Sequence, residues 1–121
     1  MISVKQFLKS LTHAFRGVRL VFKHEQNFRI LVVLAGVAIL FSILFRITTN
    51  QFIVVLLLIG AILTLEMINS IFERIVDTFK PRIHPAVRDI KDIMAGAVLA
   101  TSLIALIIGF TIFWPHVISL F

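Results

Sequence analysis

The stretch F-I-V-V-L-L-L-I-G-A-I-L-T-L occupies residues 52–65 and runs directly into Glu66, and none of its fourteen residues is charged. A helix rises about 1.5 Å per residue, so this run covers most of a bilayer hydrocarbon core about 30 Å thick. The helical pattern continues past Glu66 towards Asp77. The segment therefore predicts a membrane-spanning helix that ends in acidic residues.

Two further apolar runs lie on either side of this segment. Residues 30–45 are uncharged between Arg29 and Arg46, and another run starts near Ile93 and stays uncharged to the end of the chain. Trp114, near the end of the last run, is typical of a residue that anchors a span at the membrane interface. We expect an all-α integral membrane protein with spans at residues 28–47, 51–79 and 91–115.

The composition supports one membrane domain covering residues 1–121. Hydrophobic residues make up 60% of the chain and charged residues 15%, with a mean hydropathy of +1.07, whereas soluble domains are about 45–50% apolar and about 25% charged. The net charge of +6 comes from bases that flank the apolar runs, so we predict membrane topology and no nucleic-acid partner. The absence of cysteine excludes disulfides and thiol chemistry.

The segment 3–24 has apolar residues at helical spacing and bases on its other faces. This pattern is typical of a helix that lies in the interface of an anionic leaflet. Packing against a soluble partner is the alternative. The apolar positions are Val4, Phe7, Leu8, Leu11, Phe15, Val18 and Phe22.

The distribution of basic residues predicts the orientation. Six lie in the N-terminal segment through Arg29 and five lie in residues 74–91, which include a basic loop at 80–88, but the first loop has only Arg46 and the tail has none. Basic residues favour the cytoplasmic side. We expect a cytoplasmic N-terminus and an outside C-terminus.

Polar residues share one face of the second span. Glu66 lies about 21 Å below the outer boundary of the hydrocarbon core, where a charge costs about 2.5–3.5 kcal/mol on insertion scales. Asn69, Glu73 and Asp77 follow at i+3, i+7 and i+11, so they lie on the same face. The alternative for the last two is a solvated helix end, pairing with Arg74 or Lys80.

A second acidic position, Glu25, is expected at the same cytoplasmic boundary as Glu73. Two carboxylates from different helices could hold Mg²⁺, which prefers one or two carboxylates plus substrate phosphates. Lys91 could neutralise phosphate charge, and Asp92 beside it could also be a simple helix N-cap. Glycine-rich phosphate loops are absent from the sequence, so a nucleotide would be held by metal and charged side chains.

Several motifs resemble those of the prokaryotic diacylglycerol kinase family, which includes the undecaprenol kinases. They are E-M-I-N-S-I-F-E-R-I-V-D at 66–77, H-P-A-V-R-D-I-K-D-I-M-A-G-A-V-L at 84–99 and E-x-N-F-R at 25–29. The resemblance implies a homotrimer in the bacterial inner membrane, with active sites shared between subunits. It also implies transfer of the γ-phosphoryl group of MgATP to a lipid hydroxyl at the cytoplasmic interface.

The resemblance also implies roles for individual residues. Glu66 matches the general base that accepts the lipid hydroxyl proton, and Asn69 matches an active-site polar residue. Glu25 and Glu73 match the metal-binding carboxylates. Three residues match positions near the nucleotide: His84, Lys91 and Asp92. Two residues match positions near the lipid substrate: Asn27 and Arg29.

The acceptor is less sharply indicated than the reaction. The 25–29 motif and the start of the third span look like the undecaprenol kinase branch, and diacylglycerol is the alternative. The bulky pair Ile71 and Phe72 departs from the family pattern and could reshape the acceptor pocket. A non-catalytic membrane protein, such as a pore, would instead place polar residues along a whole span.

The orientation predicts a labelling pattern in intact cells. A cysteine that replaces Thr49 should react with an impermeant thiol reagent added outside, and one that replaces Ile83 should not, because only the first lies on the outer side. No native cysteine obscures the result. The reverse pattern would overturn the orientation.

Overall fold

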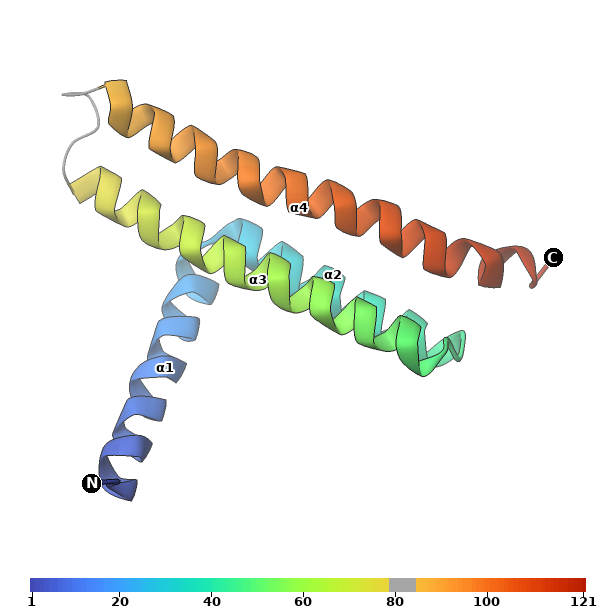
Figure 1. Ribbon diagram of the computed structural model, residues 1–121, viewed down its shortest axis with the longest axis horizontal. Helices are drawn as coiled ribbons and strands as arrows, with labels where there is room; N and C mark the ends of the chain where they lie inside the picture. Colours follow the sequence, from blue (N-terminus) through green and yellow to red (C-terminus); the bar gives the residue numbers. More distant parts are fainter. Residues whose placement is uncertain (79–84) are drawn as a thin grey trace.

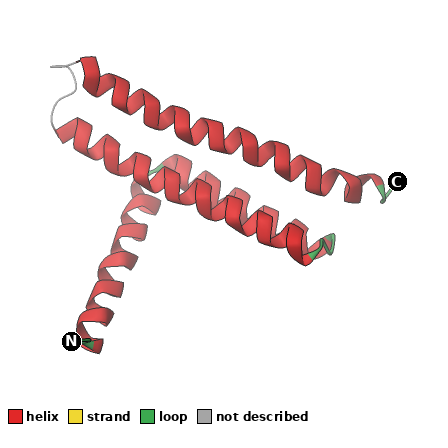
Figure 2. Cartoon of the chain, viewed as in Figure 1, coloured by secondary structure: helices red, strands yellow, loops and turns green. Residues whose placement is uncertain are grey.

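The computed structural model describes residues 1–78 and 85–121, and the described chain is entirely helical apart from short loops (Figures 1 and 2). The predicted all-α fold is therefore confirmed. The helices are α1 (Val4–His24), α2 (Gln26–Leu44), α3 (Thr49–Thr78) and α4 (Pro85–Ile118).

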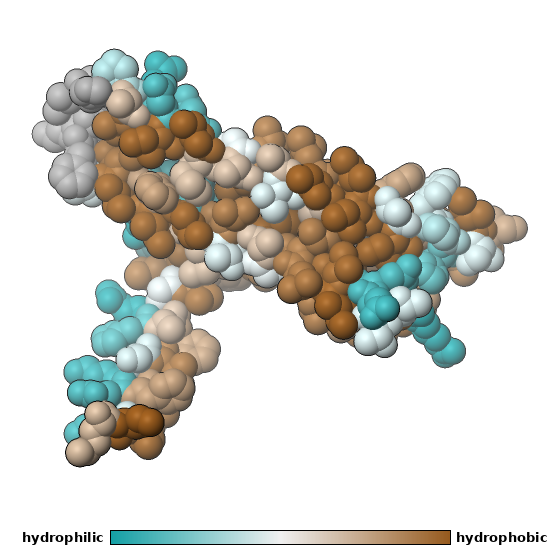
Figure 3. Space-filling model, viewed as in Figure 1, coloured by the Kyte–Doolittle hydropathy of each residue, from teal (hydrophilic) through white to brown (hydrophobic). Residues whose placement is uncertain are grey.

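Helix α1 is a surface helix that projects sideways from the other three (Figure 1). It begins after Ser3, whose hydroxyl accepts a hydrogen bond from the Gln6 amide at 3.3 Å, as an N-cap residue does. Its apolar side chains are exposed along one side, and Figure 3 shows hydrophilic residues along the other. The exposed apolar side can enter the membrane while the bases remain at the headgroups.

The remaining three helices are each long and apolar enough to cross a membrane. Helix α3 packs against both α2 and α4, so it is the central helix of the chain (Figure 1). At the far end from α1, the Phe45 ring lies 6.2 Å from that of Phe113 and 6.0 Å from that of His116, measured between centroids. These contacts join the C-terminal end of α2 to α4.

The turn between α2 and α3 is set by two capping motifs. Arg46 adopts a left-handed conformation (φ 52°), and the amides of Arg46 and Ile47 donate to the carbonyls of Ile43 and Ser42, which is the Schellman pattern. Thr48 and Gln51 then exchange side-chain-to-amide hydrogen bonds of 3.1 Å each, forming a capping box. Residues 49–51 are thus the first turn of α3, two residues earlier than the predicted start of the span at position 51.

Helix α4 begins at Pro85, six residues before the predicted position 91. Proline suits the first turn of a helix because its missing N–H has no partner there in any case. Asp92 consequently lies inside the helix, and its interpretation as an N-cap is wrong. The described part of the predicted 80–88 loop is helical, and α2 ends at Leu44, before the predicted position 47.

Burial in this chain is inverted relative to a soluble protein. Large apolar side chains are exposed along all the helices, whereas the buried side chains include Ser42, Glu66, Asn69 and Ser70. An apolar exterior suits contact with lipid, but buried polar groups need partners or a function. Three of these four lie within a single stretch of α3, which marks the candidate site.

Candidate active site

Glu25 forms the corner between α1 and α2. Its backbone is extended (φ −109°, ψ 108°), and its amide donates to the carbonyl of Val21 at 2.8 Å. Although it precedes α2, its side chain does not cap that helix. Instead, the carboxylate Oε1 accepts a hydrogen bond of 3.0 Å from the hydroxyl of Ser70 on α3.

The neighbouring residues of α3 complete an acidic cluster. Glu66 is only 3% exposed and Asn69 8%. The Asn69 amide group donates to Glu73 Oε1 at 3.4 Å. The Ser70 hydroxyl donates to Glu25, so neither residue donates to the Glu66 carboxylate. Both Glu25 and Glu73 lie within electrostatic range of Glu66. Carboxylates from the corner and from α3 therefore face one region.

The level of this cluster in the membrane follows from α1. A helix on the membrane surface lies at the interface between headgroups and hydrocarbon. Glu25 ends this helix and Ser70 bonds to Glu25, so both residues lie at the depth of that interface. Glu66 precedes Ser70 by four residues, about 6 Å along the helix, and lies on the hydrocarbon side. Glu73 follows Ser70 and lies towards the headgroups.

Asn69 has an unsatisfied acceptor. Its side-chain oxygen Oδ1 is buried, and within residues 1–78 and 85–121 it has no hydrogen-bond partner. A buried polar atom without a partner costs about 1–3 kcal/mol. The arrangement is explained if a ligand supplies a proton donor or a cation to this oxygen.

Arg29 bonds to the end of α1, and its predicted contact with the lipid substrate stays a prediction. Its Nη1 donates to the carbonyls of Phe22 and Lys23 at 2.8 and 2.7 Å, which are in the last turn of α1. The guanidinium thus holds the end of α1 against the start of α2. Asn27 is exposed on the first turn of α2, and its predicted contact with the lipid substrate stays a prediction.

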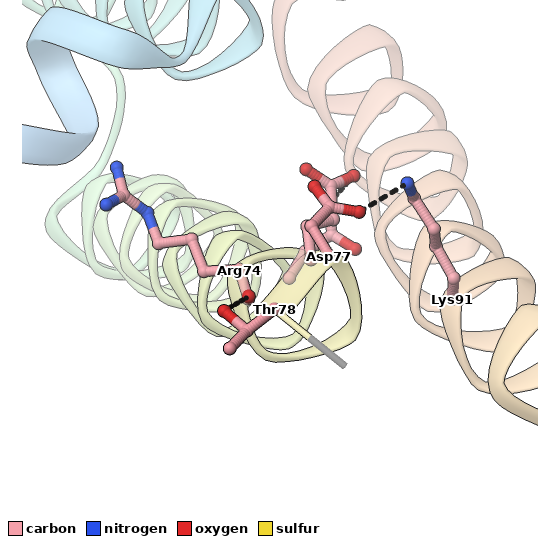
Figure 4. Close-up of polar contacts among 6 residues, drawn as sticks. Arg74, Asp77, Thr78 and Lys91 are labelled. Carbon is pink, nitrogen blue, oxygen red and sulfur yellow. Dashed lines mark hydrogen bonds and ion pairs between the residues drawn. The ribbon is translucent and has the colours of Figure 1, made fainter. Parts of the chain in front are cut away.

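The basic residue Lys91 reaches the site from α4. Its Nζ lies 3.6 Å from Asp77 Oδ1, and Figure 4 shows the two side chains directed towards each other across α3 and α4. Arg74 points away from Asp77 in the same view, so the alternative of an Asp77–Arg74 pair does not describe the structure. Asp92 is exposed one residue further on, while His84 and Lys80 lie outside the described residues.

Ser70 is the site residue that sequence reasoning missed. It lies four residues after Glu66, on the same helical face, which was the available signal. A helical serine, however, often bonds to the carbonyl four residues earlier, as Ser42 does to Ala38 at 2.7 Å. Only the packing of α3 against the corner shows that Ser70 bonds elsewhere.

Metal-ligand candidates are few in the described part of the chain. There, no three His, Cys, Asp or Glu side chains gather closely enough to form a metal site by themselves. The two carboxylates predicted to bind a cation, Glu25 and Glu73, are both present near Glu66. Such a pair needs further ligands from elsewhere.

Comparison with known proteins shows the family of the chain. The profile of the family described as prokaryotic diacylglycerol kinase matches residues 12–113. The chain belongs to the prokaryotic diacylglycerol kinase family. As a member of this family it is a membrane-embedded, ATP-dependent lipid kinase, and the alternative of a non-catalytic membrane protein is wrong.

Two relatives of this chain are named for different acceptors. An undecaprenol kinase of Bacillus subtilis (strain 168) is 33% identical over 112 residues, covering 93% of this chain and 91% of the relative. A diacylglycerol kinase of Synechocystis sp. (strain ATCC 27184 / PCC 6803 / Kazusa) is 31% identical over 114 residues, covering 93% of this chain and 65% of the relative.

The position of Arg29 leads to a test of its role. Replacing it with leucine should destabilise the protein by about 1.5–3 kcal/mol, because hydrogen bonds from a charged donor to two carbonyls are lost. Unfolding of the detergent-solubilised protein without substrates measures this. A residue that only contacts substrate would instead raise KM and leave unfolding unchanged.

Proposed function

We propose that this chain transfers the γ-phosphoryl group of MgATP to undecaprenol at the cytoplasmic face of the bacterial inner membrane, with Glu66 as the general base. The observation that carries this proposal is the place of Glu66. Its carboxylate is buried, lies one helical turn inside the level of α1, and receives no hydrogen bond from Asn69 or Ser70. The hydrogen-bonding capacity of this carboxylate is therefore not used by these two neighbours.

The position of Glu66 suits a lipid alcohol as acceptor. The hydroxyl of such a lipid stays near the headgroups, because its hydrocarbon cannot leave the bilayer. Glu66 would take the hydroxyl proton while the oxygen attacks the γ-phosphorus. The bond from that phosphorus to the β–γ bridging oxygen breaks, and ADP leaves. Asn69 Oδ1, which lacks a partner in the described chain, could accept a hydrogen bond from the hydroxyl and orient it.

The donor set near the headgroups fits Mg²⁺ bound together with a nucleotide. Glu25 and Glu73 would supply two carboxylates, and Mg²⁺ commonly uses one or two carboxylates plus substrate phosphates. When bound, the ion would neutralise charge on the β- and γ-phosphates. Lys91, on α4, would leave its ion pair with Asp77 and bind a phosphate oxygen instead.

The apolar faces that one chain exposes support association with further copies, and the family resemblance implies that the assembly is a homotrimer with shared sites. Gly96 and Gly109 of α4 face open space in the single chain, with no atom within 4 Å of a Cβ placed there. They lie four residues from Ala100 and Ala105 respectively, and small residues at this spacing allow close helix approach. Contacts from neighbouring copies would exclude water from the phosphates.

The acceptor can be identified with one competition assay. The purified kinase, given radiolabelled MgATP and equal mole fractions of undecaprenol and diacylglycerol, should form mainly undecaprenyl phosphate. The choice rests on the relative named undecaprenol kinase, which aligns with this chain over 91% of its own length. Predominant formation of phosphatidic acid would assign the chain to the other acceptor.

Replacing Glu66 with glutamine tests the general base. Turnover should fall about 10²–10⁴-fold, the usual contribution of general base catalysis, while MgATP affinity changes little because Glu66 faces the acceptor. If Glu66 only joins helices, glutamine would keep the hydrogen-bonding capacity and most of the turnover. Melting of Glu66→Ala beside Glu66→Gln separates the two roles, and near-normal turnover of Glu66→Gln excludes it as the base.

A further inference from the structure

Ser70 differs from the other helical hydroxyl residues of this chain. In the described helices, five Ser or Thr side chains donate to the carbonyl four residues earlier in their own helix. They are Thr12, Ser42, Thr78, Thr101 and Thr111. Ser70 instead donates across to Glu25, 45 residues away in sequence, at 3.0 Å.

The surroundings of this bond make it a restraint. Ser70 is only 1% exposed, the most deeply buried side chain described. Glu25 has an extended backbone between two helices, and its side chain does not cap α2. Without Ser70, the carboxylate of this corner residue could turn away from α3 and towards the headgroups. The bond uses one carboxylate oxygen, Oε1, and leaves Oε2 for another ligand.

We propose that Ser70 is a positioning residue that holds the Glu25 carboxylate against α3 in the orientation needed to bind the divalent cation of the metal–nucleotide substrate. This inference rests on the proposed function, in which Glu25 and Glu73 share that cation. Asn69 donates to Glu73 Oε1 in a similar way at 3.4 Å. Adjacent residues of α3 thus orient one carboxylate from the corner and one from α3 itself.

The expected effect is on metal requirement more than on the chemical step. Groups that hydrogen-bond to a metal ligand typically change metal affinity or activity about 10–100-fold when they are removed. The Ser70 hydroxyl bonds to Glu25 and not to the carboxylate of Glu66, the proposed base. Its loss should therefore raise the Mg²⁺ concentration for half-maximal turnover, and saturating Mg²⁺ should restore most of kcat.

A matched set of variants tests this. Ser70→Ala removes the hydroxyl, and Ser70→Val and Ser70→Thr have nearly the same shape but only threonine keeps the hydroxyl. Alanine and valine should raise the half-saturating Mg²⁺ concentration about tenfold or more, while threonine stays near wild type. Ser42→Ala is the control, because Ser42 is also buried and its hydroxyl bonds only within α2.

A second readout needs neither metal nor turnover. Hydrogen exchange of the metal-free protein should be faster at residues 21–29 in Ser70→Ala and Ser70→Val, because the corner loses its bond to α3. It should be unchanged in Ser70→Thr and Ser42→Ala. The valine–threonine comparison remains informative if the alanine variant does not fold, since both replacements fill the site.

The link to Glu25 can be tested directly. If Ser70 acts through Glu25, then Ser70→Ala added to Glu25→Gln should raise the Mg²⁺ requirement no further. An unchanged Mg²⁺ requirement in Ser70→Ala and Ser70→Val, or equal effects of valine and threonine, would overturn the proposal. Failure of the proposed function appears elsewhere, as full turnover by Glu66→Gln or as a different phosphorylated lipid.

Discussion

The thickness of the bilayer hydrocarbon core is the constraint on which this architecture depends. Helix α2 has 19 residues, about 29 Å, and the part of α3 from Thr49 to Ser70 spans about 32 Å, so both match a core of about 30 Å. They share the turn at 45–48 at one end and the level of Glu25 and Ser70 at the other. The corner that ends α1 therefore meets α3 near Ser70, and the site lies at that boundary of the core.

This boundary reconciles two opposed requirements of a lipid kinase. The acceptor hydroxyl stays with its hydrocarbon, while phosphates need water, cations and bases. The face of α3 crosses the boundary, with Glu66 on the hydrocarbon side of Ser70 and Glu73 and Asp77 towards the headgroups. Carboxylates within range of one another repel, and this repulsion favours binding of a cation. The Lys91 ammonium near Asp77 supplies part of the compensating charge.

The exposed side chains Ile71 and Phe72 bear on the choice of acceptor. Proteins named undecaprenol kinase and diacylglycerol kinase both align with more than nine-tenths of this chain, so a shared helical frame accompanies two acceptors. Ile71 and Phe72 are 54% and 37% exposed and lie outside the buried face formed by Glu66, Asn69 and Ser70. These two large side chains therefore shape the surface that meets lipid or another subunit, and not the interior of one chain.

The sequence by itself determined the features that depend on local periodicity and on partition between water and lipid. The three spans, the amphipathic α1 and the shared face of Glu66, Asn69 and Glu73 follow from the 3.6-residue repeat and from the length of each apolar run. These properties belong to single helices. They do not require knowledge of which helices become neighbours.

Only the tertiary structure decided the partners of the polar side chains. The bond from Ser70 to Glu25, the use of Arg29 to hold the end of α1 and the pairing of Asp77 with Lys91 each join separate helices. Ser70 could instead have bonded to a carbonyl of its own helix, and Asp77 could have paired with Arg74. The choice depends on how α1, α3 and α4 approach one another. Sequence spacing can place a polar group on a face, but the group that it meets there is set by packing.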